Sequence, residues 1–342
     1  MFIGRREISH NFTPLVIAEI GINHGGSLEL AKMMVKLARD SGAECVKHQT
    51  HFVEDEMTKE AHSIYPPNAD DSIFDVIKSN SLNKDEEIEL KKFAENLGLI
   101  YISTPFSRQA ADFLNEINIP AFKIGSGESN NLALIDHIAS FKKPIIMSTG
   151  MQSVESIKQS VSVINAYHNE ICLLECTNLY PSPPENVSLQ GIIDLRNTFP
   201  DIPIGFSDHS IGPSMALAAL GLGASIIERH FTDSRFRSGP DITCSMDPAE
   251  LRFLIDRSKE IHIALNNPKQ RTKEEEAVYA FARSSIVADQ DLKKGTIIDK
   301  SHIWARRPGN GEISGSEFFD ILGKELIKDL SKGDQLKWSD LK

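Results

Sequence analysis

Long apolar runs are missing from this sequence of 342 residues. None approaches the roughly 18 consecutive apolar residues of a membrane-spanning helix, and residues 1–13, MFIGRREISHNFT, lack the apolar core of a signal peptide. Basic tracts are also missing, and the formal net charge is -11. Because phosphate backbones are bound by clustered lysines and arginines, nucleic acid is not an expected partner. We expect a soluble cytoplasmic protein that binds no membrane and meets any anionic ligand in a local pocket.

Cysteine is scarce, with four residues in the chain. They are Cys45, Cys172, Cys176 and Cys244, and no two of them form a C-x-x-C pair or stand at zinc-finger spacing. Three of the four fall within apolar, strand-like runs. Reduced thiols in a protein core are therefore favoured over a catalytic or metal-binding role.

The apolar residues that are present, 40% of the chain beside 25% charged residues, suit a globular protein. Up to about residue 267, short runs rich in Val, Ile and Phe alternate with stretches of helical period. Eight of these runs are predicted to be strands, at residues 14–22, 44–51, 99–106, 121–128, 144–150, 171–177, 203–208 and 225–231.

Helical patterns follow these strands. In SLELAKMMVKLARDSG (27–42), Leu28, Ala31 and Met34 fall on one face and a glycine closes the segment. In NKDEEIELKKFAENLG, Asn83 is a candidate N-cap, followed by acidic residues in the first turn. Eight strand and helix pairs within about 250 residues predict a (β/α)8 TIM barrel. A doubly wound open sheet is the competing fold, although no G-x-G-x-x-G motif opens a helix.

The composition changes after a charged segment that contains KQRTKEEEAV. Short strand-like pieces then alternate with glycine-centred turns, which indicates a small β-rich domain. We expect a TIM-barrel catalytic domain over residues 1–267, a linker over 268–283 and the small domain over 284–342.

A weak internal repeat lies within the small domain. DLKKGTIIDKSHI (291–303) aligns with DLSKGDQLKWSDL (329–341), with Asp, Leu, Lys, Gly and Ser in common. Either two such halves pair around a pseudo-twofold axis, or two turn segments are alike by chance.

Polar side chains stand at the ends of nearly all the predicted strands. In a TIM barrel the carboxyl ends of the strands meet at one mouth, where active sites lie. One polar strand end would indicate a solvated loop, whereas eight that converge indicate catalysis or ligand binding. The side chains concerned include Glu19, Lys47, Gln49, Thr104, Lys123, Ser126, Glu128, Ser148, Asn178, Tyr180, Ser207, His209, Glu228 and His230.

Two histidines end neighbouring predicted strands. His209 and His230 should project side by side into the mouth, and the alternation of a strand puts Glu228 on the same face as His230. Two imidazoles with nearby carboxylates suit a divalent metal such as manganese, iron or zinc. The alternative is that each histidine hydrogen-bonds to the backbone or to a phosphate.

Two lysines lie within predicted strands. Lys47 and Lys123 would be costly inside a barrel unless an anion compensates them. With the hydroxyls of Thr104 and Ser126 they could form a pocket for a phosphate and a carboxylate. Ordinary ion pairs with carboxylates such as Glu19 are equally compatible with the charges.

A series of motifs carries a family resemblance. EIGINHGGS, VKHQTH, EDEM, STPFS, KIGSGE, STGM, TNLYPSP, SDHS, ERHFT, GPD and RRPGNG occur in this order from about residue 14 to the C-terminus. Together they resemble bacterial N-acetylneuraminate synthase, the sialic acid synthase family. The C-terminal segment is similar to the antifreeze-like, or SAF, domain of that family.

The resemblance implies condensation of phosphoenolpyruvate with an N-acetylated hexosamine, N-acetylmannosamine in the type enzymes. It implies His209 and His230 as ligands of a divalent metal, with Mn²⁺ the usual ion of the family and Mg²⁺ or Co²⁺ as substitutes. Positions that match the phosphoenolpyruvate pocket are Lys47, Thr104, Lys123, Ser126, Asn178 and Ser207. Positions that match the sugar site are Asn68, Tyr180, Asp241 and, in the SAF domain, Arg307. Family members are homodimers in which that domain caps the partner's barrel, so Arg307 would act in trans.

The chemistry also places carboxylates in the reaction. Attack of phosphoenolpyruvate C3 on the open-chain aldehyde leaves positive character at C2, to which water must add before phosphate leaves. Glu19, Glu128 and Glu228 are the candidate general bases and cation stabilisers. The metal motifs do not distinguish N-acetylmannosamine from the 6-deoxy diacetamido sugars of legionaminic or pseudaminic acid synthases. Remoter alternatives are a metal-dependent hydrolase on the same barrel and a saccharide-binding protein.

Overall fold

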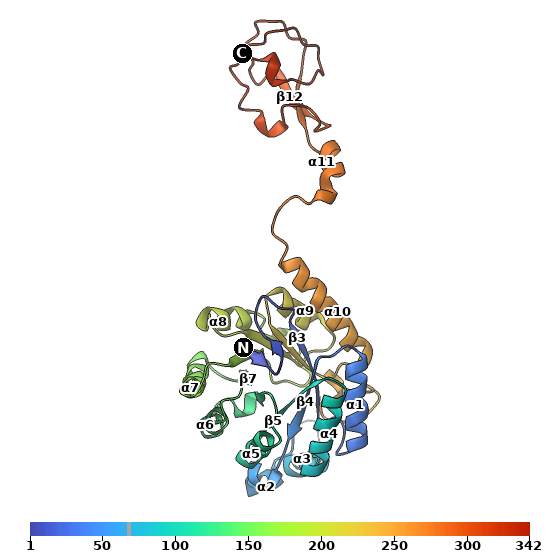
Figure 1. Ribbon diagram of the computed structural model, residues 1–342, viewed down its shortest axis with the longest axis vertical. Coiled ribbons are helices and arrows are strands. Elements are labelled where there is room, and N and C mark those ends of the chain that lie inside the picture. Colours follow the sequence, from blue (N-terminus) through green and yellow to red (C-terminus); the bar gives the residue numbers. More distant parts are fainter. Residues whose placement is uncertain (67–69) are drawn as a thin grey trace. The chain divides into compact units, whose positions relative to one another are not determined.

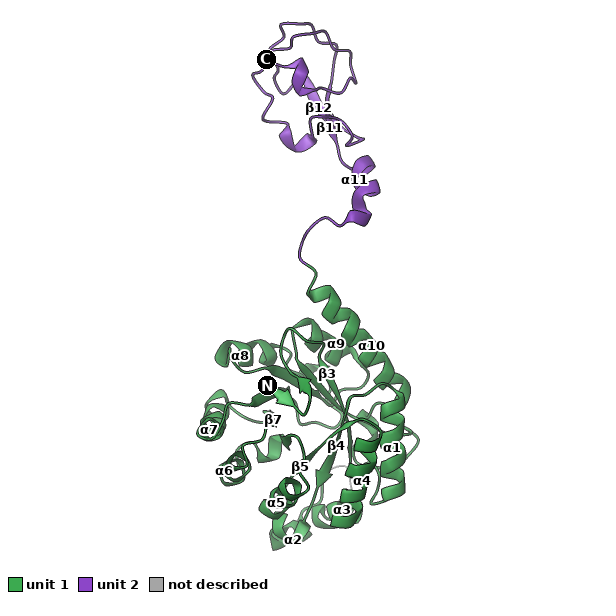
Figure 2. Ribbon diagram, in the orientation of Figure 1, with its two compact units in different colours: residues 1–267 green, residues 268–342 purple. Residues whose placement is uncertain are grey.

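The computed structural model describes residues 1–66 and 70–342 and divides into two compact units, Met1–Asn267 and Pro268–Lys342 (Figure 2). The first unit holds all eight predicted strands. The segment predicted as a linker, residues 268–283, groups with the second unit and contains the short helix α11 (Glu276–Ala282).

Eight parallel strands close into a barrel in the first unit. In chain order they are β3 (Leu15–Gly21), β4 (Cys45–Thr50), β5 (Ile100–Pro105), β6 (Phe122–Ile124), β7 (Ile145–Ser148), β8 (Ile171–Cys176), β9 (Ile204–Asp208) and β10 (Ile226–His230). The last strand, β10, pairs with the first, β3, so that the sheet has no edge. The TIM barrel is confirmed, and the open doubly wound sheet is excluded.

One main helix follows each barrel strand and lies on the outside (Figure 1). These helices are α1 (Leu28–Asp40), α4 (Lys84–Asn96), α5 (Arg108–Glu116), α6 (Leu132–Ser140), α7 (Val154–Asn165), α8 (Gln190–Thr198), α9 (Ser214–Gly221) and α10 (Pro248–Leu265). The described residues of the connection from β4 to α4 include the short helices α2 (Val53–Glu56) and α3 (Ile73–Asn80) and, between them, a 3-10 helix (Lys59–Ser63).

Side-chain caps fix where several of these helices begin. Ser27 accepts a hydrogen bond from the backbone of Leu30 at the start of α1. At the start of α4, Asn83 and Glu86 form a reciprocal capping box, which confirms the predicted N-cap. Such caps satisfy backbone donors that the helix itself leaves unpaired.

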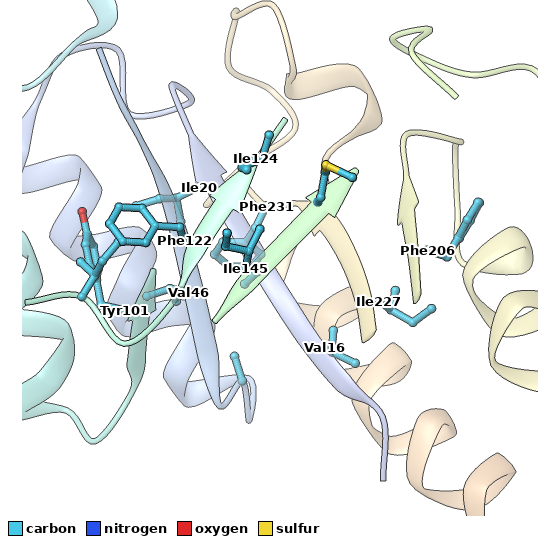
Figure 3. Packing of buried hydrophobic residues seen from close by; sticks show 14 of the residues in the cluster. Val16, Ile20, Val46, Tyr101, Phe122, Ile124, Ile145, Phe206, Ile227 and Phe231 are labelled. Atoms are coloured by element: carbon cyan, nitrogen blue, oxygen red, sulfur yellow. The ribbon is translucent and has the colours of Figure 1, made fainter. Parts of the chain in front are cut away.

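The barrel has an apolar layer on each side of its strands. The outer layer lies between strands and helices and includes Val46, Phe122 and Ile227 (Figure 3). The inner layer fills the barrel towards the amino ends of its strands. It is joined by Ile3 and Ile8, which belong to and directly follow the N-terminal hairpin of β1 (Phe2–Ile3) and β2 (Arg6–Glu7). Polar inward-facing residues therefore remain only towards the carboxyl ends of the strands, where a cavity opens.

The second unit has its own core around two antiparallel strands, β11 (Ser285–Ala288) and β12 (Ile303–Arg306). The two repeat segments pair within it: Leu292 and Leu330 exchange backbone hydrogen bonds of 2.8 and 2.9 Å. Asp329 accepts from the backbone of Lys294, and Asp291 accepts from that of Lys332. These reciprocal contacts confirm that the repeated segments pair symmetrically.

Among the described residues, no helix combines the length and the apolarity that crossing a bilayer requires. The longest barrel helix, α10, carries charged residues along its length. This agrees with the lack of long apolar runs in the sequence.

Gly205 offers a test of how tightly the barrel interior is packed. A Cβ atom there would lie 2.5 Å from the carbonyl oxygen of Ile226 and 2.5 Å from Leu174 Cδ2. We expect Gly205→Ala to lower the free energy of unfolding by roughly 1–3 kcal/mol, because the added methyl group overpacks the core. Thermal unfolding followed by far-ultraviolet circular dichroism measures the effect.

Gly221→Ala is the matched control, since apart from the chain neighbours and the backbone of its own helix no atom lies within 4 Å of the added Cβ. Its melting temperature should stay close to that of the unsubstituted protein. Equal melting temperatures for the Gly205 and Gly221 variants would contradict the packing argument.

Candidate active site

A cavity opens at the carboxyl ends of the barrel strands. Most of the side chains predicted for the site line it together: Lys47, Thr104, Lys123, Ser126, Asn178, Tyr180, Ser207, His209, Glu228 and His230. The other residues that line it are Gln49, Phe106, Gly125, Gly127, Ser148 and Cys176. Seven consecutive barrel strands, β4 to β10, or the loops that follow them, contribute to this surface.

Two lysines and two glutamates form a buried cluster at the base of the cavity. Lys47 Nζ lies 2.5 Å from Glu19 Oε2 and 4.0 Å from Glu228 Oε2. Lys123 Nζ lies 3.4 Å from Glu228 Oε1. Ion pairs are thus present, with Glu19 and Glu228 as the partners, and the cluster is neutral when all four groups are ionised.

Hydroxyl and amide groups hold this cluster in place. Lys47 donates to Thr104 Oγ1 at 3.2 Å, and Lys123 donates to Ser148 Oγ at 2.7 Å. Ser207 donates to Glu228 Oε1 at 3.0 Å. Lys47 keeps one N–H bond that is directed at neither Thr104 nor Glu19, and this bond is available to an anionic ligand. Lys123 also donates to the Ile124 carbonyl oxygen at 3.3 Å, so an anion that binds it must replace one of its present partners.

The two glutamates have opposite acidities. Burial raises the pKa of Glu19 to about 7, an effect that Lys47 opposes and Glu228 reinforces. Burial also acts on Glu228, but Lys123 and Lys47 outweigh it and lower the pKa of Glu228 to about 2. Near neutral pH, Glu19 can therefore gain or lose a proton while Glu228 stays ionised.

The histidines lie beside each other as the adjacent strands require, with ring centroids 5.4 Å apart. His209 Nδ1 is 2.9 Å from the carbonyl oxygen of Thr177, so Nδ1 donates and Nε2 keeps its lone pair. Burial lowers the pKa of His209 to about 4 and that of His230 to about 3. Both imidazoles are therefore neutral at physiological pH, as metal ligands must be.

A metal ion would find two nitrogen ligands here rather than a complete protein cage. In the part of the chain that the structure describes, no group of three or more His, Cys, Asp or Glu side chains is arranged to hold a metal. Asp241 Oδ2 lies 3.6 Å from His230 Nδ1, which has no hydrogen-bond partner among the described residues. The residues fit an open divalent site in which substrate or water oxygens complete the coordination.

A second pocket adjoins the cavity and shares Gln49, Phe106, Tyr180 and His230 with it. Asp241 lines this pocket, and burial raises its pKa to about 6. Apolar side chains make up most of the remaining wall: Ile22, Met57, Pro66, Ile73, Val76, Ile77 and Pro240.

Three predicted site residues lie elsewhere or cannot be placed. Glu128 does not line the cavity; its Oε2 accepts a hydrogen bond from Asn131 Nδ2 at 2.8 Å, next to the start of α6. Arg307 is exposed in the second unit, in the turn after β12. Asn68 lies outside the described residues.

Three residues that line the cavity have no role assigned to them from the sequence: Gln49 and Ser148, expected there as polar strand ends, and Cys176, expected in the core. Gln49 stands two residues after the inward-facing Lys47, and Ser148 two residues after Ile146 of the inner apolar layer, so strand periodicity marks both as inward-facing. Gln49 Nε2 donates to Glu19 Oε1 at 2.9 Å. Cys176 is buried like a core thiol, as predicted, yet its Sγ borders the cavity 3.9 Å from His209 Nδ1.

Comparison with known proteins follows the same division of the chain. Residues 34–270 match the NeuB family, and residues 283–342 match the SAF domain. The chain belongs to the NeuB family. The family match covers the strands from β4 to β10 that line the cavity.

Individual relatives can be aligned with this NeuB family member over almost its whole length. N,N'-diacetyllegionaminic acid synthase of Campylobacter jejuni is 35% identical, covering 94% of this chain and 98% of the relative. Human N-acetylneuraminate-9-phosphate synthase is 32% identical, covering 94% of this chain and 90% of the relative. These relatives are sugar acid synthases, and the chain is an enzyme of that kind.

A solved structure is similar as well. The N-acetylneuraminic acid (sialic acid) synthetase from Leptospira borgpetersenii serovar Hardjo-bovis, in complex with citrate, has a TM-score of 0.74 and 29% sequence identity. The match covers 81% of this chain and 94% of that one.

The four thiols should be inert in the folded protein. All are buried, and burial raises the pKa of Cys176 to about 11 and that of Cys244 to about 12. Since the thiolate is the reactive form, we expect 5,5'-dithiobis(2-nitrobenzoate) at pH 8 to modify none of them within minutes. In urea all four should react. Rapid modification of one thiol in the native protein would contradict this and would point to Cys176.

Proposed function

We propose that this protein condenses phosphoenolpyruvate with N-acetylmannosamine and releases N-acetylneuraminic acid and phosphate. The observation that carries the proposal is the placing of two buried ammonium groups beside two neutral histidines in one cavity of a NeuB family member. This reaction needs cationic groups that bind the phosphate and carboxylate of phosphoenolpyruvate, and ligands for a metal that polarises the sugar aldehyde. We infer a cytoplasmic location, where phosphoenolpyruvate is made.

Phosphoenolpyruvate would lie on the floor of the cavity. Lys47 and Lys123 would bind its phosphate and carboxylate groups through charge-assisted hydrogen bonds. The neutral groups proposed to complete this pocket are Thr104, Ser126, Asn178 and Ser207. Gly150 supports two of them, because its N–H donates to Ser126 Oγ at 3.1 Å and a Cβ there would lie 1.9 Å from Asn178 Oδ1.

His209 and His230 would hold a divalent metal, which we propose is Mn²⁺, with Mg²⁺ or Co²⁺ as substitutes. Such an ion polarises a carbonyl oxygen and stabilises the negative charge that develops on it. His209 is oriented for this by Thr177, and the pair faces the same space as the two lysines.

The glutamates would divide the proton transfers and the charge stabilisation. As C3 of phosphoenolpyruvate bonds to the aldehyde carbon, C2 becomes positive, and ionised Glu228 can stabilise that charge. Water then adds to C2 and gives up a proton, for which Glu19 has a suitable pKa. The C2–O bond to phosphate then breaks while the new C2 hydroxyl gives up its proton and becomes the ketone. Of the two protons that the water loses, one ends on the alkoxide oxygen of the former aldehyde and the other on the released phosphate. Glu128 has no part in this assignment, because its carboxylate lies away from the cavity.

The sugar would occupy the outer part of the site. Tyr180 lines both the cavity and the adjoining pocket, Asp241 lines the adjoining pocket, and Asn68 is proposed to contribute as well. We also propose a homodimer in which the SAF domain of one copy covers the barrel mouth of the other, with Arg307 contacting the sugar. Tyr65 and Phe236, in loops that follow β4 and β10, expose large apolar side chains suited to such a cover.

A second acceptor is favoured by the wall of the adjoining pocket. Its apolar side chains suit a methyl group at C6 and an acetamido group at C4 better than they suit hydroxyl groups. Those substituents belong to the 6-deoxy diacetamido sugars, and two relatives at 35% identity are N,N'-diacetyllegionaminic acid synthases. The mechanism would be unchanged.

Phosphate release from phosphoenolpyruvate tests the function. We expect the metal-stripped protein to be inactive and to release phosphate after Mn²⁺ is restored, in the presence of N-acetylmannosamine. His209→Ala and His230→Ala should abolish release while circular dichroism shows a native fold. Preference for a diacetamido sugar would select the second acceptor. Release with no sugar would instead favour a hydrolase, and no release with any sugar would favour a saccharide-binding protein.

The pH dependence tests the role of Glu19. Its raised pKa means that it is protonated below about pH 7 and can act as a base only above it. We expect kcat/KM to rise with pH through this region. Glu19→Gln should remove this rise of kcat/KM with pH and lower kcat about 10²–10⁴-fold. Glu128→Gln, the matched control, should keep both the rise of kcat/KM with pH and the rate. An unchanged dependence of kcat/KM on pH in the Glu19 variant would refute the assignment.

A further inference from the structure

The residues that directly precede the two histidines form a buried ion pair on the opposite side of the sheet. Asp208 precedes His209, Arg229 precedes His230, and the two are register partners on β9 and β10. Arg229 Nε lies 3.3 Å from Asp208 Oδ2, and their side chains are 1% and 0% exposed. Because neighbouring strand residues face opposite sides, this pair lies outside the barrel while His230 faces the cavity.

The pair also holds the backbone that follows His209. Asp208 Oδ1 accepts a hydrogen bond from the Ser210 backbone N–H at 2.8 Å. Arg229 Nη2 donates to the Ser210 carbonyl oxygen at 2.6 Å. Asp208 and Ser210, the residues before and after His209, thus both contact the Arg229 side chain. Because Arg229 directly precedes His230, these contacts link the backbone at the two histidines.

Stability alone does not account for this arrangement. Removing two charges from water costs several kcal/mol per ion, and apolar replacements of buried pairs are often neutral or stabilising. Arg229 Nη1 moreover has no hydrogen-bond partner among the described residues, which adds to the cost of burying the guanidinium. The hydrogen bonds that the pair does make are both to the backbone of Ser210, directly after His209.

We propose that Asp208 and Arg229 are positioning residues that set the separation and orientation of His209 and His230 for a divalent metal. The inference rests on the proposed function in so far as the two histidines bind that metal. A site with only two protein ligands has little redundancy, since neither histidine can be displaced without losing half of the protein's contribution. Residues that orient ligands in this way typically change metal affinity 10–100-fold when they are replaced.

Mn²⁺ binding to the full-length protein without substrates tests the proposal, with free Mn²⁺ measured by electron paramagnetic resonance. Arg229→Lys keeps the charge but loses the planar fork that reaches both Asp208 and Ser210. We expect it, and Asp208→Asn, to raise the Kd for Mn²⁺ at least 10-fold while circular dichroism still shows a folded protein. Unchanged Kd values in both variants would overturn the proposal.

A charge-free double variant separates positioning from stability. Asp208→Leu combined with Arg229→Met removes both charges together, so it avoids leaving one ion unpaired in the core. We expect it to bind Mn²⁺ as weakly as the single variants even where its melting temperature equals that of the unsubstituted protein. If the double variant binds Mn²⁺ as tightly as the unsubstituted protein, the proposal is overturned. This test remains valid even if the single variants fail to fold.

Glu87→Gln is the matched control for the loss of a buried charge outside the barrel. Glu87 is 1% exposed and accepts hydrogen bonds from Thr50 on β4 and Tyr101 on β5, and neither strand is paired with β9 or β10. It should lower the melting temperature without changing the Kd for Mn²⁺. If the unsubstituted protein binds no Mn²⁺, the metal part of the proposed function fails and this inference fails with it. If the protein binds Mn²⁺ and the Asp208 and Arg229 variants bind it equally well, the inference alone fails.

Discussion

The hydrogen bonding of β10 to β3 is the contact on which the site depends. It closes the sheet and makes His230 the register partner of Glu19, although they lie at opposite ends of the barrel sequence. Closure also brings the carboxylates of Glu19 and Glu228 to the same lysine, Lys47. In an open sheet these strands would be edges, and the charges gathered here would be separated and solvated. The chemistry is therefore a consequence of topology before it is a consequence of any single side chain.

Much of this could be predicted from the sequence because strand periodicity and barrel geometry are regular. The alternation that puts Lys47 and Gln49 on one face is a local property, and the meeting of strand ends follows from the fold. Glu128 shows the limit: after β6 the chain turns into a short helical segment, which directs that carboxylate towards Asn131. Periodicity holds only while the strand continues.

Other features depend on distances that no sequence pattern encodes. The division of acidity between Glu19 and Glu228 follows from which carboxylate has two ammonium neighbours, and that is decided by separations of 2.5 to 4.0 Å. The Asp208 and Arg229 pair looks in the sequence like further polar residues of an active-site motif. Strand alternation puts Arg229 on the face opposite Glu228 and His230, but only the structure shows that Asp208 and Arg229 pair with each other and bind the Ser210 backbone.

The neutrality of the buried cluster has a thermodynamic consequence for ligand entry. Two lysines are already balanced by two carboxylates, so a substrate that carries both a phosphate and a carboxylate group brings uncompensated negative charge into a site shielded from water. The least costly compensation is a proton, and Glu19, with a pKa of about 7, is the group able to accept it; Glu19 must lose this proton again before it can act as the base. Binding of the anion should thus be linked to proton uptake, and the heat of binding should vary with the ionisation enthalpy of the buffer.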